Sequence, residues 1–284
     1  MRNSYPSKLL LFGEYAVIAG GEGFAIPYPK YNSVWTQAHS SNEIGYDLGP
    51  FYKYLKTFEN VNSILDLEKF RVDLENNFYL KSDIPIGMGL GSSGSVVAAI
   101  YDRYAKQVVS DLNRYDLKLL RSQLAVMENF FHETSSGLDP LVILIDQPIH
   151  LLHGGEMRII QDGMLLLNEI DINLVDTKVE RKASTLITHF TNKMQEAFYQ
   201  SSIQNRYLPL VSACINTLLN KDKKEFYHNL TQLSLFQLEH FAFAIPESIR
   251  GRWTTGLKTG KEIFKLCGAG GGGFMLCFNA PSIQ

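Results

Sequence analysis

The segment with the clearest chemical meaning is Pro85–Ser95, which reads Pro-Ile-Gly-Met-Gly-Leu-Gly-Ser-Ser-Gly-Ser and leads into a helix-compatible run from Val96. Three glycines in five positions allow positive φ angles and a close approach of the backbone to a ligand. Two serines then open the helix, where free N–H groups and the positive end of the helix dipole favour an anion. Serine is also a good N-cap residue, so the alternative is an ordinary glycine-rich loop. We favour a phosphate cradle.

A carboxylate, Glu128, stands out in a second segment. The spacing of apolar residues over 117–132 predicts a helix with an apolar stripe, and Glu128 falls at the edge of that stripe. Leu119, Val126 and Phe130 make the opposite side apolar as well, so we expect a helix packed on two sides. A partly desolvated carboxylate there needs a cation, a metal ion or another partner. The alternative is an ion pair with Arg or Lys on the helix face.

Two further polar residues have an ordinary interpretation when the residues are taken alone. Residues 132–140 read as a polar turn that ends in Asp139-Pro140. An exposed turn is a place where side chains meet substrate, but an Asp in such a turn is also typical of an Asx turn, and we favour the Asx turn. Lys8 opens a predicted strand, where the ordinary interpretation is a solvated lysine at the strand edge.

The apolar patterns predict a mixed α/β chain. Predicted strands cover 8–12, 33–38, 70–74, 141–145, 149–152, 174–176, 264–267 and 274–278. Predicted helices cover 50–58, 92–109, 117–132, 184–199, 208–220 and 223–243. Long amphipathic helices dominate only after about residue 170, so we predict an N-terminal domain of residues 1–170 and a C-terminal domain of residues 171–284.

Composition narrows the class of protein. The chain has 284 residues, 45% of them hydrophobic and 20% charged, with a formal net charge of −2, which predicts a soluble, folded enzyme of one large or two ordinary domains. It lacks the basic excess that binding to nucleic acid or a membrane needs. Cys214, Cys267 and Cys277 lack metal-ligand spacing, so we expect free thiols in a reducing compartment. Without a membrane-length apolar run or a signal peptide, we expect a cytoplasmic protein.

Three segments together resemble the motifs of the GHMP kinases, the family of galactokinase and the homoserine, mevalonate and phosphomevalonate kinases. Pro85–Ser93 resembles the family's phosphate loop, Pro6–Gly20 resembles the motif near the start, and Lys265–Gly273 resembles the motif near the end. Order and spacing agree over nearly the whole chain. The resemblance implies a two-domain α/β (α+β) fold of the GHMP kinase type, with the active site in the interdomain cleft.

Within the family, the chain is most similar to the mevalonate kinases. Glu128, His132 and Ser135–Asp139 resemble their Glu-Xaa3-His-Gly-Xaa-Pro-Ser-Gly-Xaa-Asp pattern, and residues 176–181 resemble their Thr-Lys-Val-Pro-Arg segment. Some positions depart from the family: Ser7 and Ser135 replace a usual Gly and Pro, Gly94-Ser95 replaces Ala-Ala and is similar to phosphomevalonate kinase, and Tyr15 and Ala183 differ at positions that bear on substrate contacts.

The resemblance implies a kinase that uses ATP and Mg²⁺ to phosphorylate the primary hydroxyl of mevalonate or a related alcohol. It implies that Asp139 is the general base with Lys8 beside it, and that Ser93 and Glu128 are metal ligands, with Ser92 as the rival hydroxyl. The implied nucleotide-binding residues are Gly87, Gly89, Leu90, Gly91, Ser92, Ser93 and Gly94. The implied substrate contacts are Glu14, Tyr15, Arg181, Gly270 and Gly271.

Several alternatives stay open. The chain could be a phosphomevalonate kinase or another small-molecule kinase of the family. A related decarboxylase would share the phosphate loop but not the Glu128-to-Asp139 pattern, and a non-catalytic sensor of nucleotide and metabolite would be supported by the loss of Lys8, Glu128 or Asp139. His150 and His153 lack a third zinc ligand, so we interpret them as surface or interface residues. We expect a small-molecule substrate and neither nucleic acid nor membrane as partner, and family analogy allows a homodimer.

Overall fold

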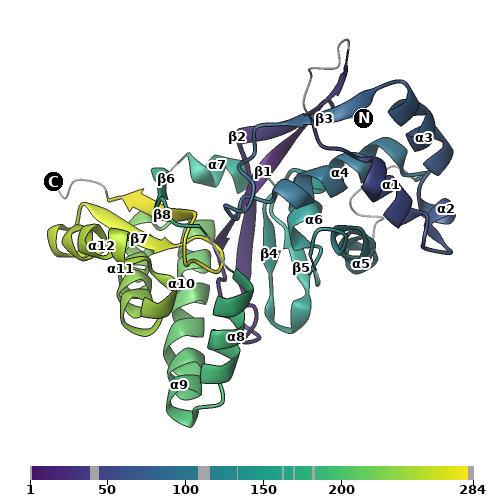
Figure 1. The fold of residues 1–284 in the computed structure, drawn as a ribbon. Helices are drawn as coiled ribbons and strands as arrows, with labels where there is room; N and C mark the ends of the chain where they lie inside the picture. The colour runs from purple at the N-terminus through teal and green to yellow at the C-terminus, as the bar shows by residue number, and fades with distance from the viewer. Residues whose placement is uncertain are drawn as a thin grey trace. The chain divides into compact units, whose positions relative to one another are not determined.

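The fold is that of a computed structural model, which describes residues 2–38, 45–107, 116–132, 134–161, 163–168, 170–180 and 183–280. The chain forms two compact units whose segments alternate along the sequence (Figure 1). Unit 1 consists of Met1–Lys8, Pro27–Ile86 and Leu90–Asp146, and unit 2 consists of Leu9–Ile26, Gly87–Gly89 and Gln147–Gln284. The strands β1 (Ser4–Phe12) and β2 (Gly23–Gln37) each begin in one unit and end in the other.

The described part of unit 1 combines a strand pair with six helices. β3 (Phe78–Ser82) runs antiparallel to β2, with Ser33 opposite Ser82. The helices are α1 (Gly49–Leu55), α2 (Val61–Ile64), α3 (Leu67–Glu75), α4 (Ser92–Tyr104), α5 (Leu117–Glu128) and α6 (Leu138–Ile145). α4, α5 and α6 pack against one another, and they carry Ser93, Glu128 and Asp139, whereas Lys8 lies on β1.

The helix α6 is buried on nearly every side. All of its residues except Asp139 are buried, because the run Leu141–Ile145 is apolar without interruption. The prediction of a strand over 141–145 is wrong, since an apolar run this short has no periodicity that separates a buried strand from a buried helix. Gly137, in the left-handed conformation, is the N-cap, and Asp139 therefore lies in the first helical turn rather than in a polar turn.

Two other sequence expectations in unit 1 are corrected. Residues 70–74 lie in α3, because the Asp66 carboxylate accepts the Lys69 N–H at 3.0 Å and caps that helix. The helix α5 is not packed on two sides, since Leu119 is 56% exposed and Val126 is 42% exposed. The helix over 92–109 is confirmed in position but ends at Tyr104.

Unit 2 contains two antiparallel strand groups. The first residues of β2 pair with β4 (Ile149–Leu151), which pairs with β5 (Met157–Ile159). A three-stranded sheet has the order β6-β8-β7, with β6 (Ile172–Asp176), β7 (Glu262–Leu266) and β8 (Phe274–Asn279). The strands β7 and β8 follow the predicted ranges 264–267 and 274–278 closely, because each contains a short apolar stretch, Ile263-Phe264 in β7 and Phe274–Phe278 in β8.

Unit 2 also contains helices, two of which pack on the three-stranded sheet. They are α7 (Gly163–Leu167), α8 (Ala183–Lys193), α9 (Ala197–Ser202), a π-helix η2 (Ile203–Tyr207), α10 (Leu208–Leu219), α11 (Lys223–His240) and α12 (Glu247–Thr259), with the 3₁₀ turns η1 (His153–Gly155) and η3 (Ala242–Ala244). α11 and α12 pack on β7, and the buried Trp253 stacks on Phe264. The single helix predicted over 184–199 is divided into α8 and α9.

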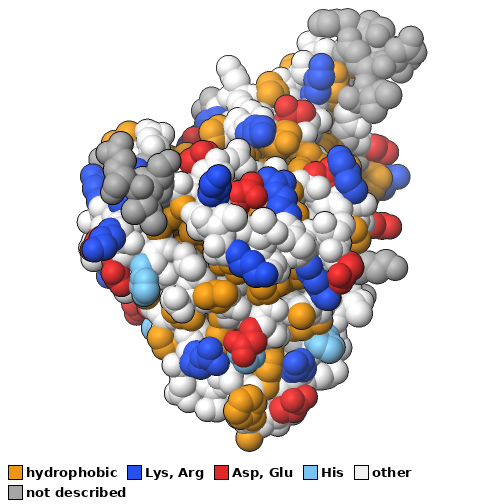
Figure 2. All heavy atoms as spheres, turned by 90° about the vertical axis from the view of Figure 1, so that its left-hand side faces the viewer, with side chains coloured by type: hydrophobic (Ala, Val, Ile, Leu, Met, Phe, Trp, Pro, Cys, Tyr) orange, Lys and Arg blue, Asp and Glu red, His pale blue; other side chains and the backbone are white. Residues whose placement is uncertain are grey.

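Charged side chains of both signs occur on the surface of the molecule (Figure 2). Figure 2 shows acidic and basic side chains interspersed over one face of the molecule, in keeping with the small net charge of −2. Among the described residues, no helix is long and apolar enough to span a lipid bilayer.

Gly137 offers a test of how α6 is positioned. Its φ is +69°, and an added Cβ would lie 2.2 Å from the Arg121 carbonyl oxygen of α5. We expect Gly137→Ala to destabilise the protein by more than the roughly 1–2 kcal/mol of a left-handed alanine alone, as measured by urea unfolding. The control is Gly154→Ala, where φ is +78° but no atom lies within 4 Å of the added Cβ. Equal losses in the two variants would contradict a close α5–α6 approach at Gly137.

Candidate active site

The helix α4 begins without a side-chain cap. Its N-cap is Gly91, in the left-handed conformation, so the serine N-cap considered from the sequence is not observed. Gly87, Gly89 and Gly91 have φ angles of 75°, 83° and 77°, which side chains rarely tolerate. Because the N-cap has no side-chain acceptor for the first N–H groups of α4, those groups can bind an anion.

Lys8 and Asp139 meet beside this helix start. The Lys8 N–H donates to the Leu90 carbonyl at 2.9 Å, and Lys8 Nζ lies 2.8 Å from Asp139 Oδ2. Lys8 is 7% exposed, so it is a buried, paired lysine rather than the solvated one considered from the sequence. The Asp139 side chain is 32% exposed, so its carboxylate remains accessible to a ligand.

Two glycines make room for this ion pair. A Cβ on Gly91 would lie 2.9 Å from Lys8 Cγ, and a Cβ on Gly94 would lie 3.0 Å from Asp139 Cβ. Both distances are shorter than a normal carbon–carbon contact. The glycines of the phosphate loop therefore serve the packing of Lys8 and Asp139 as well as the backbone conformation.

A second polar cluster joins α4 to the end of α5. Ser93 Oγ donates to Glu128 Oε1 at 3.0 Å, and His132 Nε2 lies 3.0 Å from Ser93 Oγ. Ser135 Oγ donates to the other oxygen of Glu128. The rival hydroxyl, Ser92, forms a hydrogen bond with Tyr46 instead. Of the two serines, Ser93 is therefore the one hydrogen-bonded to Glu128.

Burial has a strong effect on Glu128, which is 4% exposed. Burial, and then the nearby negative charge of Asp139, raise the pKa of Glu128 from 4.5 to about 7, while the hydrogen bonds from Ser135 and Ser93 and the charge of Lys8 act in the opposite direction. The carboxylate is therefore costly to ionise without an added cation. A hydroxyl and a carboxylate are hard oxygen donors of the kind that Mg²⁺ prefers, so Ser93 and Glu128 fit such an ion chemically.

His132 and Ser135 are contacts of this cluster that received no role from the sequence. His132 follows Glu128 by four residues, a spacing that places side chains on the same side of a helix, so the sequence did hold a signal for it. In the structure, His132 Nε2 lies within hydrogen-bond distance of the Ser93 hydroxyl that contacts Glu128. Nothing in the local pattern pointed to Ser135, which appeared only as a departure from the family.

The remaining predicted residues lie in unit 2 or outside the described residues. Glu14 is buried and forms an ion pair with Lys265, whose Nζ also donates to the Leu266 carbonyl at 2.7 Å. The buried Tyr15 donates its hydroxyl hydrogen to the Ala269 carbonyl at 2.6 Å. Arg181 lies outside the described residues.

The glycine-rich loop after β7 is closely packed. A Cβ on Gly270 would lie 2.5 Å from the Ala244 carbonyl oxygen, and one on Gly271 would lie 2.3 Å from Leu186 Cδ1. Within unit 2, a Cβ on Gly273 would lie 3.3 Å from Met88 Cα. Met88 belongs to the glycine-rich segment Pro85–Ser95, so the two glycine-rich loops approach each other at this point.

Other polar groups in unit 2 show no metal-binding arrangement. The buried His150 contacts Glu22 at 2.8 Å, so it is not the surface residue expected, and His153 lies 3.4 Å from the same carboxylate. Within the described part of the chain, no group of three or more His, Cys, Asp or Glu side chains is arranged to hold a metal ion. All three cysteines are buried free thiols.

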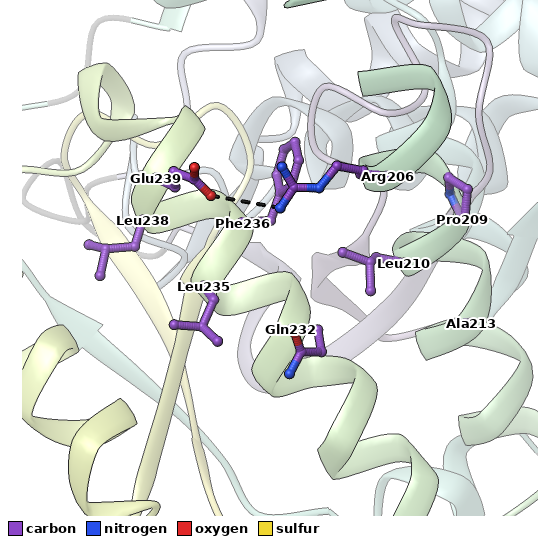
Figure 3. A pocket seen from close by; sticks show the side chains of 9 residues that line it. All are labelled: Arg206, Pro209, Leu210, Ala213, Gln232, Leu235, Phe236, Leu238 and Glu239. Atoms are coloured by element: carbon purple, nitrogen blue, oxygen red, sulfur yellow. Dashed lines mark ion pairs between the residues drawn. The ribbon is translucent and has the colours of Figure 1, made fainter. Parts of the chain in front are cut away.

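A groove of about 840 Å³ lies between α10 and α11 (Figure 3). Arg206 and Glu239 lie at one end of it, 3.8 Å apart, and its walls are mainly apolar. None of the residues predicted to bind nucleotide or metal or to act in catalysis lines this groove.

The raised pKa of Glu128 gives a pH-dependent prediction. The proton on this side chain stabilises the folded protein fully below about pH 4.5, and that contribution is lost as the pH rises through about 7. In metal-free buffer, we expect the free energy of unfolding of the wild type to fall relative to Glu128→Gln over this window, by at most about 3 kcal/mol. Asp139→Asn should reduce this fall in unfolding free energy, because it removes the negative charge that helps to raise the pKa of Glu128. Parallel urea-unfolding curves for wild type and Glu128→Gln at every pH would contradict the assignment.

The buried Glu14–Lys265 pair gives a prediction about folding. Lys265→Met leaves a buried carboxylate without its ammonium partner, so we expect a loss of about 3–5 kcal/mol in unfolding free energy. The double variant Glu14→Gln/Lys265→Met should recover most of this loss in the same urea-unfolding assay. A stable Glu14→Gln variant with a raised KM for the acceptor alcohol would instead support the substrate contact expected from the sequence.

Comparison with known proteins agrees with the geometry. Residues 52–146 match the family described as "GHMP kinases N terminal domain". A mevalonate kinase of Thermococcus onnurineus is 25% identical in an alignment of 175 residues that covers 53% of this chain and 51% of the relative, so the chain spans about half the length of that curated relative. A mevalonate kinase of Dictyostelium discoideum is 23% identical in an alignment of 340 residues that covers 96% of this chain and 86% of the relative.

The fold has a counterpart among solved structures. The crystal structure of L. major mevalonate kinase in complex with R-mevalonate has a TM-score of 0.66 and 16% identity, covering 99% of this chain and 88% of that chain. At 16% sequence identity, this structural similarity shows a shared fold and nothing more. Together with the matched family domain, it identifies residues 52–146 as a GHMP kinase N-terminal domain within a chain that has the mixed α/β fold of the GHMP kinases and most resembles the mevalonate kinases.

Proposed function

We propose that this protein is an ATP- and Mg²⁺-dependent kinase that phosphorylates the primary hydroxyl of mevalonate to give 5-phosphomevalonate. The observation that carries the proposal is the 2.8 Å pair of Lys8 Nζ and Asp139 Oδ2, placed beside the uncapped start of α4. Phosphoryl transfer requires a group that accepts the hydroxyl proton, positive charge near the phosphates and precise positioning. This cluster supplies candidates for all three.

Each residue of unit 1 has a separate task in this proposal. Asp139 accepts the proton of the attacking hydroxyl, which its partly exposed carboxylate allows. Lys8 holds Asp139 in place and brings a positive charge close to the transferring group. The N–H groups at the start of α4 bind phosphate oxygens, while Ser93 and Glu128 would hold Mg²⁺. When bound, the ion neutralises charge on the phosphates.

The choice of mevalonate rests on the relatives. The Thermococcus onnurineus and Dictyostelium discoideum relatives are both mevalonate kinases, and the L. major structure contains R-mevalonate. One local feature favours a second candidate, a phosphomevalonate kinase, because Gly94-Ser95 follows the phosphate-loop serines where Ala-Ala is common. The described contacts of Gly94 are with Asp139 and Pro140, so this feature bears on the base as well as on the acceptor.

A direct assay separates the two acceptors. Purified protein with MgATP should form ADP when mevalonate is added, with a kcat/KM higher than for phosphomevalonate, galactose or homoserine. Higher turnover on phosphomevalonate would establish the second candidate. No ADP with any of these alcohols would contradict the proposal.

Asp139→Asn tests the base. The amide has nearly the shape of the carboxylate but cannot accept the hydroxyl proton, so we expect kcat to fall by about 10²–10⁴-fold while the protein still binds a nonhydrolysable ATP analogue in calorimetry. The control is Asp146→Asn, at the C-cap of the same helix, which should retain normal turnover. Near-normal kcat in Asp139→Asn would remove Asp139 as the base.

A further inference from the structure

Ser135 makes three hydrogen bonds whose directions are determined. Its N–H donates to Asn129 Oδ1 at 2.8 Å, and its Oγ accepts the Gly137 N–H at 3.0 Å. Its hydroxyl hydrogen goes to Glu128 Oε2. The backbone N–H anchors Ser135, and the Gly137 N–H occupies one lone pair of Ser135 Oγ. The hydroxyl hydrogen is therefore oriented toward the Glu128 carboxylate.

The other oxygen of Glu128 has a different kind of partner. Oε1 accepts the Ser93 hydroxyl at 3.0 Å, and Ser93 in turn contacts His132. The carboxylate is therefore held at both oxygens in a site where it is 4% exposed. Only the Oε1 side combines two oxygen donors from different helices, so that side is the one suited to a shared cation.

We propose that Ser135 is a positioning residue for the cation site of Ser93 and Glu128. By donating to Oε2, it stops the carboxylate from rotating and presents Oε1 together with the Ser93 hydroxyl. This chain carries a serine where the pattern it resembles has a proline. Because proline has no hydroxyl, the hydrogen bond from residue 135 to Glu128 depends on the serine of this chain. The inference rests on the proposed use of Mg²⁺ at these two residues.

The expected effect follows from the behaviour of metal sites in general. Hydrogen-bond partners that orient a metal ligand are worth about 10–100-fold in metal affinity or activity. Removing the Ser135 hydroxyl leaves Oε2 without its donor and the carboxylate free to turn away from Ser93. We therefore expect weaker cation binding, with nucleotide binding in the absence of a metal unchanged.

The test uses Mn²⁺ as the probe, with the full chain and a nonhydrolysable ATP analogue. Electron paramagnetic resonance of free Mn²⁺ reports the dissociation constant directly and needs no turnover. Ser135→Ala should raise this constant by about tenfold or more, and Ser135→Thr, which keeps the hydroxyl, should restore it. The matched control is Ser136→Ala, because the Ser136 hydroxyl accepts the Leu138 N–H at 3.3 Å and lies in the same turn.

The outcomes separate this inference from the kinase assignment. The positioning role is wrong if Ser135→Ala binds Mn²⁺ as tightly as wild type, or if Ser135→Thr loses as much affinity as Ser135→Ala. Neither result bears on the proposed kinase activity, which turnover on mevalonate tests separately. If wild type shows no nucleotide-dependent Mn²⁺ binding, the cation site and this role both fall. If wild type binds Mn²⁺ and the serine variants differ as expected, but no acceptor is phosphorylated, the proposed function fails and the positioning role stands. Metal-free nucleotide binding by Ser135→Ala checks that the variant is folded.

Discussion

The site in unit 1 depends on the ion pair between the buried Lys8 ammonium of β1 and Asp139 in the first turn of α6, which both lie close to the start of α4. A lysine this buried is stable as a cation only when it is paired, and its partner sits in the first turn of an almost wholly apolar helix. Glycine makes this close packing possible, because a Cβ at Gly91 or Gly94 would collide with Lys8 or Asp139. Replacing either glycine would therefore disturb the ion pair before it disturbed any phosphate contact.

The two carboxylates of the site, Asp139 and Glu128, have different charge environments. Asp139 has a cation in contact, whereas Glu128 is buried with hydroxyl and imidazole partners and is opposed by the charge of Asp139. The result is one carboxylate paired with a lysine and one whose pKa is about 7. In the proposed function, a divalent cation held by Ser93 and Glu128 would supply further positive charge to the Glu128 carboxylate.

Unit 2 uses a buried ion pair for a different purpose. Lys265 and Glu14 join the end of β7 to the turn after β1, and Tyr207 from the π-helix donates to the Glu14 carbonyl at 2.6 Å. Tyr15 extends this link to the glycine-rich loop through Ala269. Glu14 and Tyr15, two of the residues expected to contact substrate, are therefore also parts of the framework of this unit. A buried ion pair is strongly destabilising when one partner is lost, which makes the framework sensitive to single substitutions.

The sequence by itself determined the features that depend on local pattern. Three glycine-rich or lysine-bearing motifs, the long amphipathic helices α10 and α11, the strands β7 and β8 and the Glu128–His132 spacing can all be recognised from neighbouring residues. Local pattern misled at residues 70–74 and 141–145, where short apolar runs suit a strand or a helix equally well and the capping by Asp66 and the burial of α6 decide the outcome. The family resemblance implied Lys8 beside Asp139, and local pattern gave no sign of it. Tertiary structure alone decided that Ser135 donates to Glu128 and that Glu14 pairs with Lys265. These contacts join residues far apart or across a turn, and their energies come from burial, which a side chain acquires only when separate elements pack together.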